Sequence, residues 1–312
     1  MENLIEVRGL VKKYKELIAV DKLDLDVKKG RILGLLGPNG SGKSTTINCI
    51  LSLLKKYGGS VKIYGKEMSP DAYDIKEKIG VVFQEVGVYD ELNVYENIDY
   101  FCGLYIRDKK EREKLIQRTL DLVGLNDFVK FKPKKLSGGL LRRLNIACGI
   151  AHRPEIIILD EPTVAVDPQS RNNILEGIKK LNQEGSTIIY TSHYMEEVDY
   201  LCDDIVIIDK GRVIAKGTSN ELREMIQVNE KISFVADNLS DQLINKLKNM
   251  AHIIDFSYKE DTCKMTFSKS DEKLLSLVEI LTESKVEYRS INVEKPSLND
   301  VFLELAGKDL RD

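Results

Sequence analysis

GPNGSGKST, residues Gly37–Thr45, decides the fold of this chain. It follows the apolar run RILGLL, which reads as a strand, and precedes TINCILSLL, which reads as a helix. A glycine-rich turn in that position lets successive backbone N–H groups point at phosphate oxygens, and the helix dipole adds to their attraction. The pattern is typical of a phosphate-binding loop. Its residues are Gly37, Pro38, Asn39, Gly40, Ser41, Gly42, Lys43, Ser44 and Thr45.

A second apolar run, EIIILDEP, ends in two carboxylates, Asp160 and Glu161. Four consecutive apolar residues suit a strand buried on both faces of a parallel sheet, and ligands bind at the carboxyl ends of such strands. With the phosphate loop nearby, Lys43 would reach the β and γ phosphates, while Ser44 and Asp160 would hold Mg²⁺. Glu161 would orient water and accept its proton. Without that loop, an ordinary acidic turn would be the better interpretation.

LSGGLLRRLNIACGIAHRP, residues Leu136–Pro154, separates these motifs. Ser137, Gly138 and Gly139 open a helix whose exposed N–H groups and hydroxyl can approach an anion. Alone, the segment would be only a capped helix. Because it lies just upstream of the acidic strand, the segment can also be interpreted as part of a phosphate-binding site.

Residues 1–225 resemble the nucleotide-binding subunit of ABC transporters, whose signature is carried by the segment at Ser137. The resemblance implies four further roles. Tyr14 would stack on adenine, Gln84 would contact Mg²⁺ and water, and His193 would contact the γ phosphate. Asp167 would lie in a loop that joins two subunits. Glu161, His193 and Gln84 are then the catalytic candidates, with ATP and Mg²⁺ as ligands.

Two departures from the family pattern stand out. Leu140 occupies a signature position that is often Gln, so a polar contact to the nucleotide would be lost. The loop before Asp167 reads Val-Ala-Val where the family often has Ser-Gly-Leu, which would alter communication between subunits. We expect hydrolysis to persist.

The fold expected from pattern and resemblance is α/β: an ATPase cassette with a mostly parallel sheet, an antiparallel β portion and a helical insert at about 88–153. Lys109–Val123 has the apolar spacing of a helix within that insert. Residues 226–312 form a small α+β domain of order βαββαβ, which is compatible with a ferredoxin-like fold. Its strands are expected at Lys231–Ala236, Ile253–Tyr258, Cys263–Phe267 and Tyr288–Val293, with helices at Asp241–Asn249 and Asp271–Ser284 and a last one capped at Ser297.

Composition limits the partners. Lys and Arg total 47 against 50 Asp and Glu, a net charge of -3, so no global positive field would attract nucleic acid. No apolar run approaches the roughly 20 residues that span a bilayer, and no secretory signal is visible at the N-terminus. The five scattered cysteines indicate free thiols. The expected location is the cytoplasm, peripheral to the cytoplasmic face of the membrane.

In the family that this chain resembles, the signature of one subunit faces the phosphate loop of another. The expected partners are therefore a second ATP-binding subunit, taken to be the same chain, and an integral membrane permease that docks at residues 86–100. The tail from Pro296 resembles the drug-resistance branch of exporters. The alternatives are a non-transporter ABC ATPase acting on ribosomes or DNA, and a regulatory GTPase, which would need a guanine-reading motif that Asn245-Lys246-Leu247-Lys248 does not complete.

Overall fold

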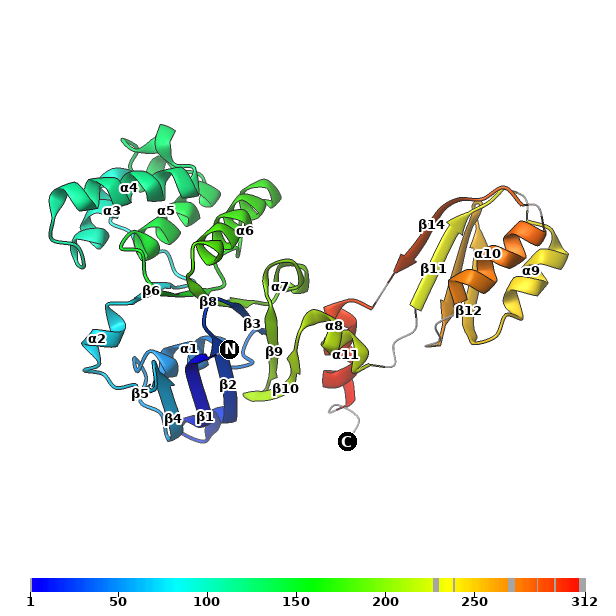
Figure 1. Cartoon of the computed structure of the whole chain (residues 1–312), viewed down its shortest axis with the longest axis horizontal. Helices are drawn as coiled ribbons and strands as arrows, with labels where there is room; N and C mark the ends of the chain where they lie inside the picture. The colour runs from blue at the N-terminus through cyan, green and yellow to red at the C-terminus, as the bar shows by residue number, and fades with distance from the viewer. Residues whose placement is uncertain are drawn as a thin grey trace. The chain divides into compact units, whose positions relative to one another are not determined.

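The computed structural model describes residues 2–226, 230–237, 239–268, 273–284, 286–294 and 296–308. It divides into two compact units, Met1–Ser219 and Asn220–Asp312 (Figure 1). The expected boundary between the ATP-binding domain and the C-terminal domain, after residue 225, remains a prediction. Asp271, where one helix was expected to begin, lies outside the described residues.

The central sheet of the first unit explains why the phosphate loop and the acidic strand meet. Five of its six strands are parallel, and only β10 pairs with its neighbour in the antiparallel direction. Every residue of the strands before the phosphate loop and before the acidic pair is buried, as their apolar runs predict. The strand order is β10 (Arg212–Gly217), β9 (Asp204–Asp209), β3 (Ile32–Leu36), β8 (Thr187–Ser192), β7 (Ile156–Asp160) and β6 (Ile79–Val82).

A second sheet of the same unit is antiparallel, in the order β2, β1, β4 and β5. Its apolar residues share one core with strand β3 and with helix α1, Lys43–Ile50. This packing fixes the base of the phosphate loop between two sheets. The strands are β1 (Asn3–Tyr14), β2 (Leu17–Lys28), β4 (Gly58–Ile63) and β5 (Lys66–Glu67).

The expected helical insert is present and lies to one side of the central sheet (Figure 1). Helix α4 spans Lys109–Val123, the range that its apolar spacing predicts, because Asp108 caps its start and Gly124 ends it in the left-handed conformation. The other two long helices of the insert are α3 (Val94–Gly103) and α5 (Gly138–Ile150), with single 3-10 turns at Asn126–Phe128 and Pro133–Lys135.

Helix α5 lies directly on strand β6. A Cβ atom at Gly149 would come within 2.8 Å of the Val81 carbonyl oxygen, and one at Gly80 would collide with the Gly149 carbonyl. The two glycines therefore allow backbone-to-backbone contact between the insert and the sheet. The remaining helices of the first unit are α2 (Tyr73–Lys76), α6 (Pro168–Gln183) and α7 (Met195–Leu201), and α8 (Ser219–Glu224) follows at the division.

The second unit confirms the expected βαββαβ order. Its four antiparallel strands lie in the order β12, β13, β11, β14, which is the ferredoxin-like arrangement, and helices α9 and α10 pack over one face (Figure 1). The expected capping box is also present, since Ser297 N donates to Asp300 Oδ2 and Asp300 N donates to Ser297 Oγ. The elements are β11 (Glu230–Val235), α9 (Asp241–Lys248), β12 (Ile253–Lys259), β13 (Thr262–Phe267), α10 (Lys273–Glu283), β14 (Arg289–Glu294) and α11 (Leu298–Lys308).

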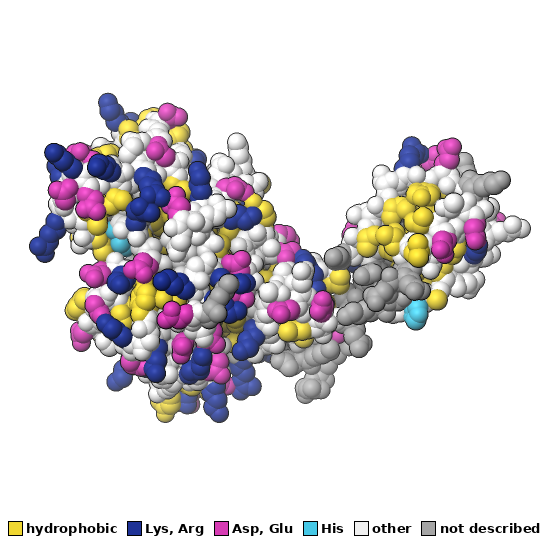
Figure 2. Space-filling model, viewed as in Figure 1, with side chains coloured by type: hydrophobic (Ala, Val, Ile, Leu, Met, Phe, Trp, Pro, Cys, Tyr) yellow, Lys and Arg dark blue, Asp and Glu magenta, His cyan; other side chains and the backbone are white. Residues whose placement is uncertain are grey.

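The surface agrees with the nearly balanced composition. On the face shown in Figure 2, basic and acidic side chains are interspersed over the first unit. All five cysteines are free thiols, as their scatter indicates. Among the described residues, no helix combines the length and the apolar character that crossing a membrane requires.

Candidate active site

The phosphate loop lies where strand β3 ends and helix α1 begins. Gly40 and Gly42 have φ values of 81° and 105°, in the region that favours glycine. A Cβ at Gly42 would also come within 2.6 Å of the Ala19 carbonyl oxygen. The buried Ser41 hydroxyl has no hydrogen-bond partner within the described part of the chain. A polar atom left unpaired inside a loop of this shape fits a ligand rich in hydrogen-bond acceptors.

Lys43 points into this loop rather than toward solvent. Its Nζ donates to the carbonyl oxygens of Gly37 at 2.8 Å and Pro38 at 3.1 Å, and lies 3.1 Å from Glu161 Oε1. The Lys43 and Glu161 side chains are only 4% and 6% exposed. Removing either member of a buried ion pair leaves the other charge uncompensated, which is costly.

Glu161 lies at the centre of the acidic end of strand β7. Its φ of 48° is unusual for a residue other than glycine, and its N–H donates to the Thr191 hydroxyl at 2.9 Å. The His193 Nδ1 atom lies 3.2 Å from Glu161 Oε2. The structure therefore brings together three residues singled out from the sequence, Lys43, Glu161 and His193, on the ends of three different elements.

The proposed Mg²⁺ ligands offer oxygen donors of the kind that this ion prefers. Asp160 is buried at the end of β7 and accepts from the Thr191 hydroxyl at 2.5 Å, while Ser44 lies in the first turn of α1. Gln84 lies just after β6 with an exposed side chain. A hydroxyl, a carboxylate and an amide oxygen suit a hard cation, so the residues fit Mg²⁺ chemically.

The backbone around Gln84 is attached to helix α5. The buried Arg142 side chain donates to the carbonyl oxygens of Gln84 at 2.8 Å and Phe83 at 3.3 Å, and Asn145 accepts from Gly87 N at 3.0 Å. Neither Arg142 nor Asn145 was predicted from the sequence. Both are polar residues on the otherwise apolar face of the helix predicted at this segment, and that position could have indicated a buried role.

The signature residues lie apart from the phosphate loop of the same chain. Ser137 caps α5 by accepting a hydrogen bond from Leu140 N at 3.3 Å. This contact uses only the backbone of Leu140, so it does not depend on the side chain that differs from the family pattern. A Cβ at Gly139 would come within 3.1 Å of Asp167 Oδ2 and would collide with Ser170. In the described residues, no hydrogen bond or ion pair joins Ser137, Gly138 or Gly139 to the loop Gly37–Gly42.

Asp167 and Tyr14 are both exposed and lie on two other elements of the first unit. Asp167 caps helix α6, and the hydrogen bond from Ser170 N lowers the pKa of its carboxyl group. Tyr14 ends strand β1 with a ring that is 43% exposed, and the Lys12 ammonium group lies 4.8 Å from the ring centroid. The Tyr14 ring is thus accessible to a planar group from outside.

Two polar residues near the acidic strand were also missed. Thr191 bonds both Asp160 and the backbone of Glu161, and Glu197 lies buried in helix α7 beside strand β8. Thr191 belongs to the run STIIYTS, which reads simply as a buried strand. The run ends in three consecutive hydroxyl-bearing residues, Tyr190–Ser192, and that ending could have indicated a polar cluster at the end of the strand.

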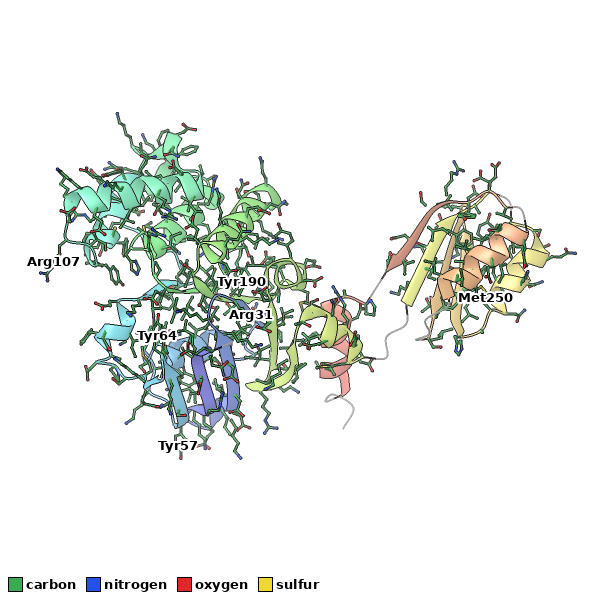
Figure 3. The ribbon with its side chains drawn as sticks, viewed as in Figure 1. Arg31, Tyr57, Tyr64, Arg107, Tyr190 and Met250 are labelled. Carbon is green, nitrogen blue, oxygen red and sulfur yellow. The ribbon has the colours of Figure 1, made fainter. Side chains whose placement is uncertain are left out.

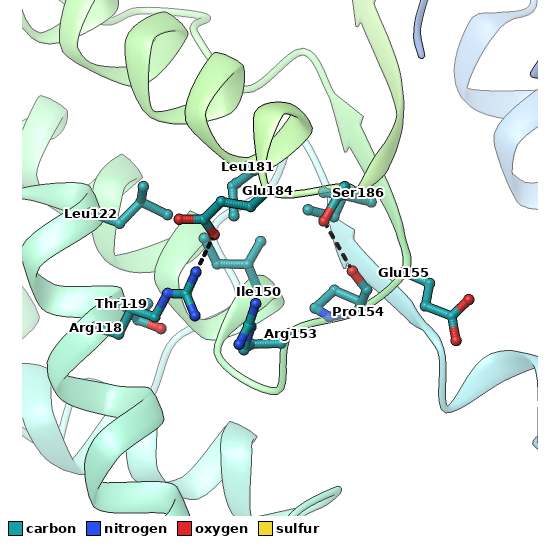
Figure 4. A pocket seen from close by; sticks show the side chains of 12 residues that line it. Arg118, Thr119, Leu122, Ile150, Arg153, Pro154, Glu155, Leu181, Glu184 and Ser186 are labelled. Atoms are coloured by element: carbon teal, nitrogen blue, oxygen red, sulfur yellow. Dashed lines mark hydrogen bonds and ion pairs between the residues drawn. The ribbon is translucent and has the colours of Figure 1, made fainter. Parts of the chain in front are cut away.

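A separate hollow of about 370 Å³ lies at the opposite, amino-terminal end of strand β7 (Figure 4). The ion pair between Arg118 and Glu184 at 2.6 Å borders it, and Ser186 Oγ donates to the Pro154 carbonyl at 3.2 Å. Because ligands of such sheets bind at the carboxyl ends of the strands, this hollow is not part of the phosphate site.

Comparison with known proteins covers both units. Residues 20–164 match the family described as ABC transporter, and residues 217–306 match the family described as ATP-binding protein DrrA1-3-like, C-terminal domain. The linearmycin resistance ATP-binding protein LnrL of Bacillus subtilis is 38% identical, over 99% of this chain and 100% of its own length. The daunorubicin/doxorubicin resistance ATP-binding protein DrrA of Streptomyces peucetius is 34% identical, over 97% of this chain and 92% of its own.

A third relative is the Nod factor export ATP-binding protein I of Cupriavidus pinatubonensis, which is 32% identical over 99% of this chain and 92% of its own length. Among solved structures, a dimeric ATP-binding cassette in a post-hydrolysis state with ADP and Pi has 30% identity and a TM-score of 0.63, covering 69% of this chain and 98% of that one. An ATP-binding subunit of an ABC transporter has 27% identity and a TM-score of 0.65, covering 71% and 92%.

Proposed function

The chain belongs to the ATP-binding subunits of ABC transporters, and from this membership we propose that it hydrolyses ATP to drive an exporter through a separate membrane-spanning permease. The family resemblance and fold inferred from the sequence are confirmed. The observation that carries the proposed chemistry is the cluster at the phosphate loop of buried Lys43 and Glu161 with partly exposed His193.

The proposed reaction transfers the γ-phosphoryl group of ATP to water. The phosphates would draw Lys43 away from the carbonyl oxygens of Gly37 and Pro38, which would also free the Glu161 carboxylate. Glu161 would then accept the proton of the attacking water, and His193 would donate a hydrogen bond to the γ phosphate. When bound, Mg²⁺ would neutralise phosphate charge, held by Ser44, Asp160 and Gln84. Tyr14 would support the adenine ring by stacking.

The proposed site needs a second copy of the chain. Ser137, Gly138 and Gly139 carry the hydrogen-bonding start of α5 but lie apart from their own phosphate loop, so they would serve the ATP held by the partner subunit. Asp167, directly beside Gly139, would lie in the same interface. Two ATP molecules would thus be enclosed in a homodimer, and hydrolysis would release it.

The proposed docking surface for the permease is residues 86–100. Val86, Tyr89, Tyr95 and Tyr100 expose between 37% and 45% of their surface there. Asn145 of helix α5 bonds Gly87 of this surface, and Arg142 bonds the adjoining Gln84, so movement of the signature would be passed to the membrane partner. The subunit would therefore work at the cytoplasmic face of the membrane.

The proposed cargo follows from the relatives. Two are named for resistance to linearmycin and to daunorubicin or doxorubicin, and one for export of Nod factor. We infer a drug-like, antibiotic or lipid-like compound moved outward. The relatives do not favour the ribosome- or DNA-acting alternative, which would require copurification of the chain with ribosomes or DNA.

The test of this function is Glu161→Gln in the full chain. The amide keeps the shape of the side chain but cannot accept the proton, so kcat should fall by about 100-fold or more while ATP binding persists. The ATP-bound variant should accumulate as a dimer in light scattering. The matched control is Glu155→Gln, at an exposed residue directly before the same strand, which should leave kcat unchanged.

Lys43→Ala completes the experiment by removing the buried cation of the loop. It should weaken ATP binding itself, because the phosphates lose their charge-assisted hydrogen bond. ATP hydrolysis by Glu161→Gln at the wild-type rate would exclude Glu161 as the base. Unchanged ATP affinity in Lys43→Ala would exclude the loop as the phosphate site.

A further inference from the structure

Glu197 is a buried carboxylate to which the proposed mechanism gives no role. It lies in the first turn of helix α7 and is 3% exposed. Its Oε2 atom accepts hydrogen bonds from the hydroxyls of Thr163 at 2.8 Å, Tyr190 at 2.8 Å and Ser192 at 2.9 Å. Tyr190, labelled in Figure 3, is fully buried in strand β8. A charged oxygen that accepts three hydroxyls is compensated inside the protein.

The other oxygen of Glu197 faces helix α6. Oε1 lies 3.3 Å from Arg171 Nε, a charge contact without hydrogen-bond geometry. The same guanidinium group lies over the Tyr194 ring, 4.6 Å from its centroid. Burial and the charge of Glu197 raise the pKa of the Tyr190 hydroxyl well above its ordinary value, so this hydroxyl remains a donor. The Glu197 carboxylate is therefore surrounded by three hydroxyl donors and one guanidinium group.

These partners belong to the segments that carry the candidate catalytic side chains. Thr163 lies two residues after Glu161, and Ser192 directly precedes His193. Ser192 Oγ also accepts from Tyr194 N at 2.9 Å, which sets the turn that bears His193. Releasing Glu197 would therefore free the turn that bears His193 and open the contact between His193 and Glu161.

We propose that Glu197 is a positioning residue for ATP hydrolysis, which holds the His193 turn against the loop after Glu161. Arg171 extends this connection, because it lies in the first turn of helix α6, whose capping residue is Asp167. Displacement of the subunit-facing start of α6 would thus reach His193 through Arg171 and Glu197. This inference rests on the proposed hydrolytic function of the same site.

The charge of Glu197 is essential to this arrangement. A glutamine has one oxygen and one NH₂ group, so it cannot accept from three hydroxyls and also face a guanidinium with an acceptor. Glu197→Gln should therefore loosen the turn with little change in side-chain volume. The phosphate loop lies on other elements, so ATP binding should be unaffected.

The experiment compares steady-state and single-turnover ATP hydrolysis by the full chain carrying Glu197→Gln, His193→Ala or both. Glu197→Gln should lower kcat by about tenfold or more, because small displacements of catalytic groups are costly, with KM and ATP affinity unchanged. In the His193→Ala background the same change should lower the rate less than about twofold, because the residue acts through His193.

Thr119→Val is the matched control for general destabilisation. It removes a buried hydroxyl that donates to Leu115 O within helix α4, away from the phosphate loop. It should lower the thermal midpoint without lowering kcat. If Glu197→Gln does not fold, Ser192→Ala and Thr163→Val each remove one donor and should show the same dependence on His193.

Additive effects of Glu197→Gln and His193→Ala would overturn the proposal, as would a Glu197→Gln protein with lower thermal stability and full kcat. Failure of the proposed function is distinguishable from this result. In that case Glu161→Gln would also hydrolyse ATP at the wild-type rate, whereas an error about Glu197 alone would leave Glu161→Gln inactive.

Discussion

The interiors of the two units differ in chemistry. Among the described residues, every buried polar or charged side chain lies within Met1–Ser219, including Lys43, Asp160, Glu161 and Glu197. In the described part of Asn220–Asp312 the buried side chains are apolar, and most of them form one core between a four-stranded sheet and two helices. The first interior combines an apolar core with charges that must stay partnered, whereas the second relies on shape and apolar contact.

The two units therefore illustrate two energetic consequences of burying side chains. Burying apolar surface stabilises a fold directly, whereas burying a charge is costly and persists only with compensating contacts. The Lys43–Glu161 pair illustrates the second case, since the nucleotide that we propose would exchange its partners. Substitutions in the second unit should therefore alter stability alone, and substitutions in the first should alter stability, pH dependence or activity.

The largest effect expected from the apolar interior is that of Phe234→Ala. Phe234 is fully buried in the core of the second unit, and truncating such a side chain costs about 3–5 kcal/mol. Urea unfolding of the full chain should show an earlier transition, while ATP affinity stays at the wild-type value. Leu275→Ala, which removes a side chain that is 62% exposed on α10, should change stability by less than about 0.5 kcal/mol. Reduced ATP affinity in Phe234→Ala would contradict the proposed separation of the two interiors.

A smaller effect is expected from a buried histidine of the first unit. His152 is 9% exposed and stacks on Tyr105 with ring centroids 3.8 Å apart. Neither ring nitrogen has a partner of hydrogen-bonding geometry in the described residues. Burial lowers its pKa to about 4, against a minor opposing effect of the Ile79 backbone. Protonation of this ring is thus disfavoured in the folded state.

The sign of the pH dependence follows from that pKa. Between pH 6.5 and about 4, the unfolded chain binds a proton that the folded chain does not, so stability is fully present above pH 6.5 and falls as the pH decreases. The loss should approach about 3 kcal/mol near pH 4. His152→Phe keeps the stacking and should flatten the change in unfolding free energy between pH 7 and pH 5. His252→Asn, at an exposed histidine of the second unit, should leave the slope unchanged, and equal slopes in all three proteins would exclude His152 as its source.

The same contrast explains how much the sequence could predict. Apolar periodicity predicted helix α4 to the residue and the βαββαβ order of elements along the second unit, because these features depend on local spacing and on which face is apolar. The motifs also predicted that Lys43 and Glu161 would meet at the edge of one sheet. These are consequences of parallel strands ending at the same side.

The polar network escaped prediction because its members look ordinary in their own segments. Glu197 follows a histidine on a short helix, and Arg142 follows a signature on a longer one. Their importance arises from neighbours distant in sequence, such as the Phe83 carbonyl 59 residues from Arg142. Only tertiary contact shows which polar side chains are buried and what compensates them.

The smallest expected effect concerns backbone strain beside the charged interior. Ala165 occupies the middle of the Val-Ala-Val segment and has a φ of 60°, a conformation that costs a residue with a Cβ about 1–2 kcal/mol. Its side chain is exposed, so Ala165→Gly removes no packing. Part of the gain is offset because glycine also gives the unfolded chain more freedom, which leaves a net stabilisation of about 0.5 kcal/mol.

Ala165→Gly therefore tests which feature of this residue activity requires: the left-handed backbone conformation alone, or the methyl group as well. Because glycine adopts the same φ without strain, the loop that leads to Asp167 should keep its path, and kcat should stay at the wild-type value while urea unfolding shifts slightly upward. Asp261→Gly is the matched change in the second unit, at a hairpin position with a φ of 59°, and should also leave kcat unchanged. A fall in kcat for Ala165→Gly alone would mean that the methyl group, exposed in one chain, contacts the second subunit. Lower stability would mean that the left-handed conformation is not a source of strain.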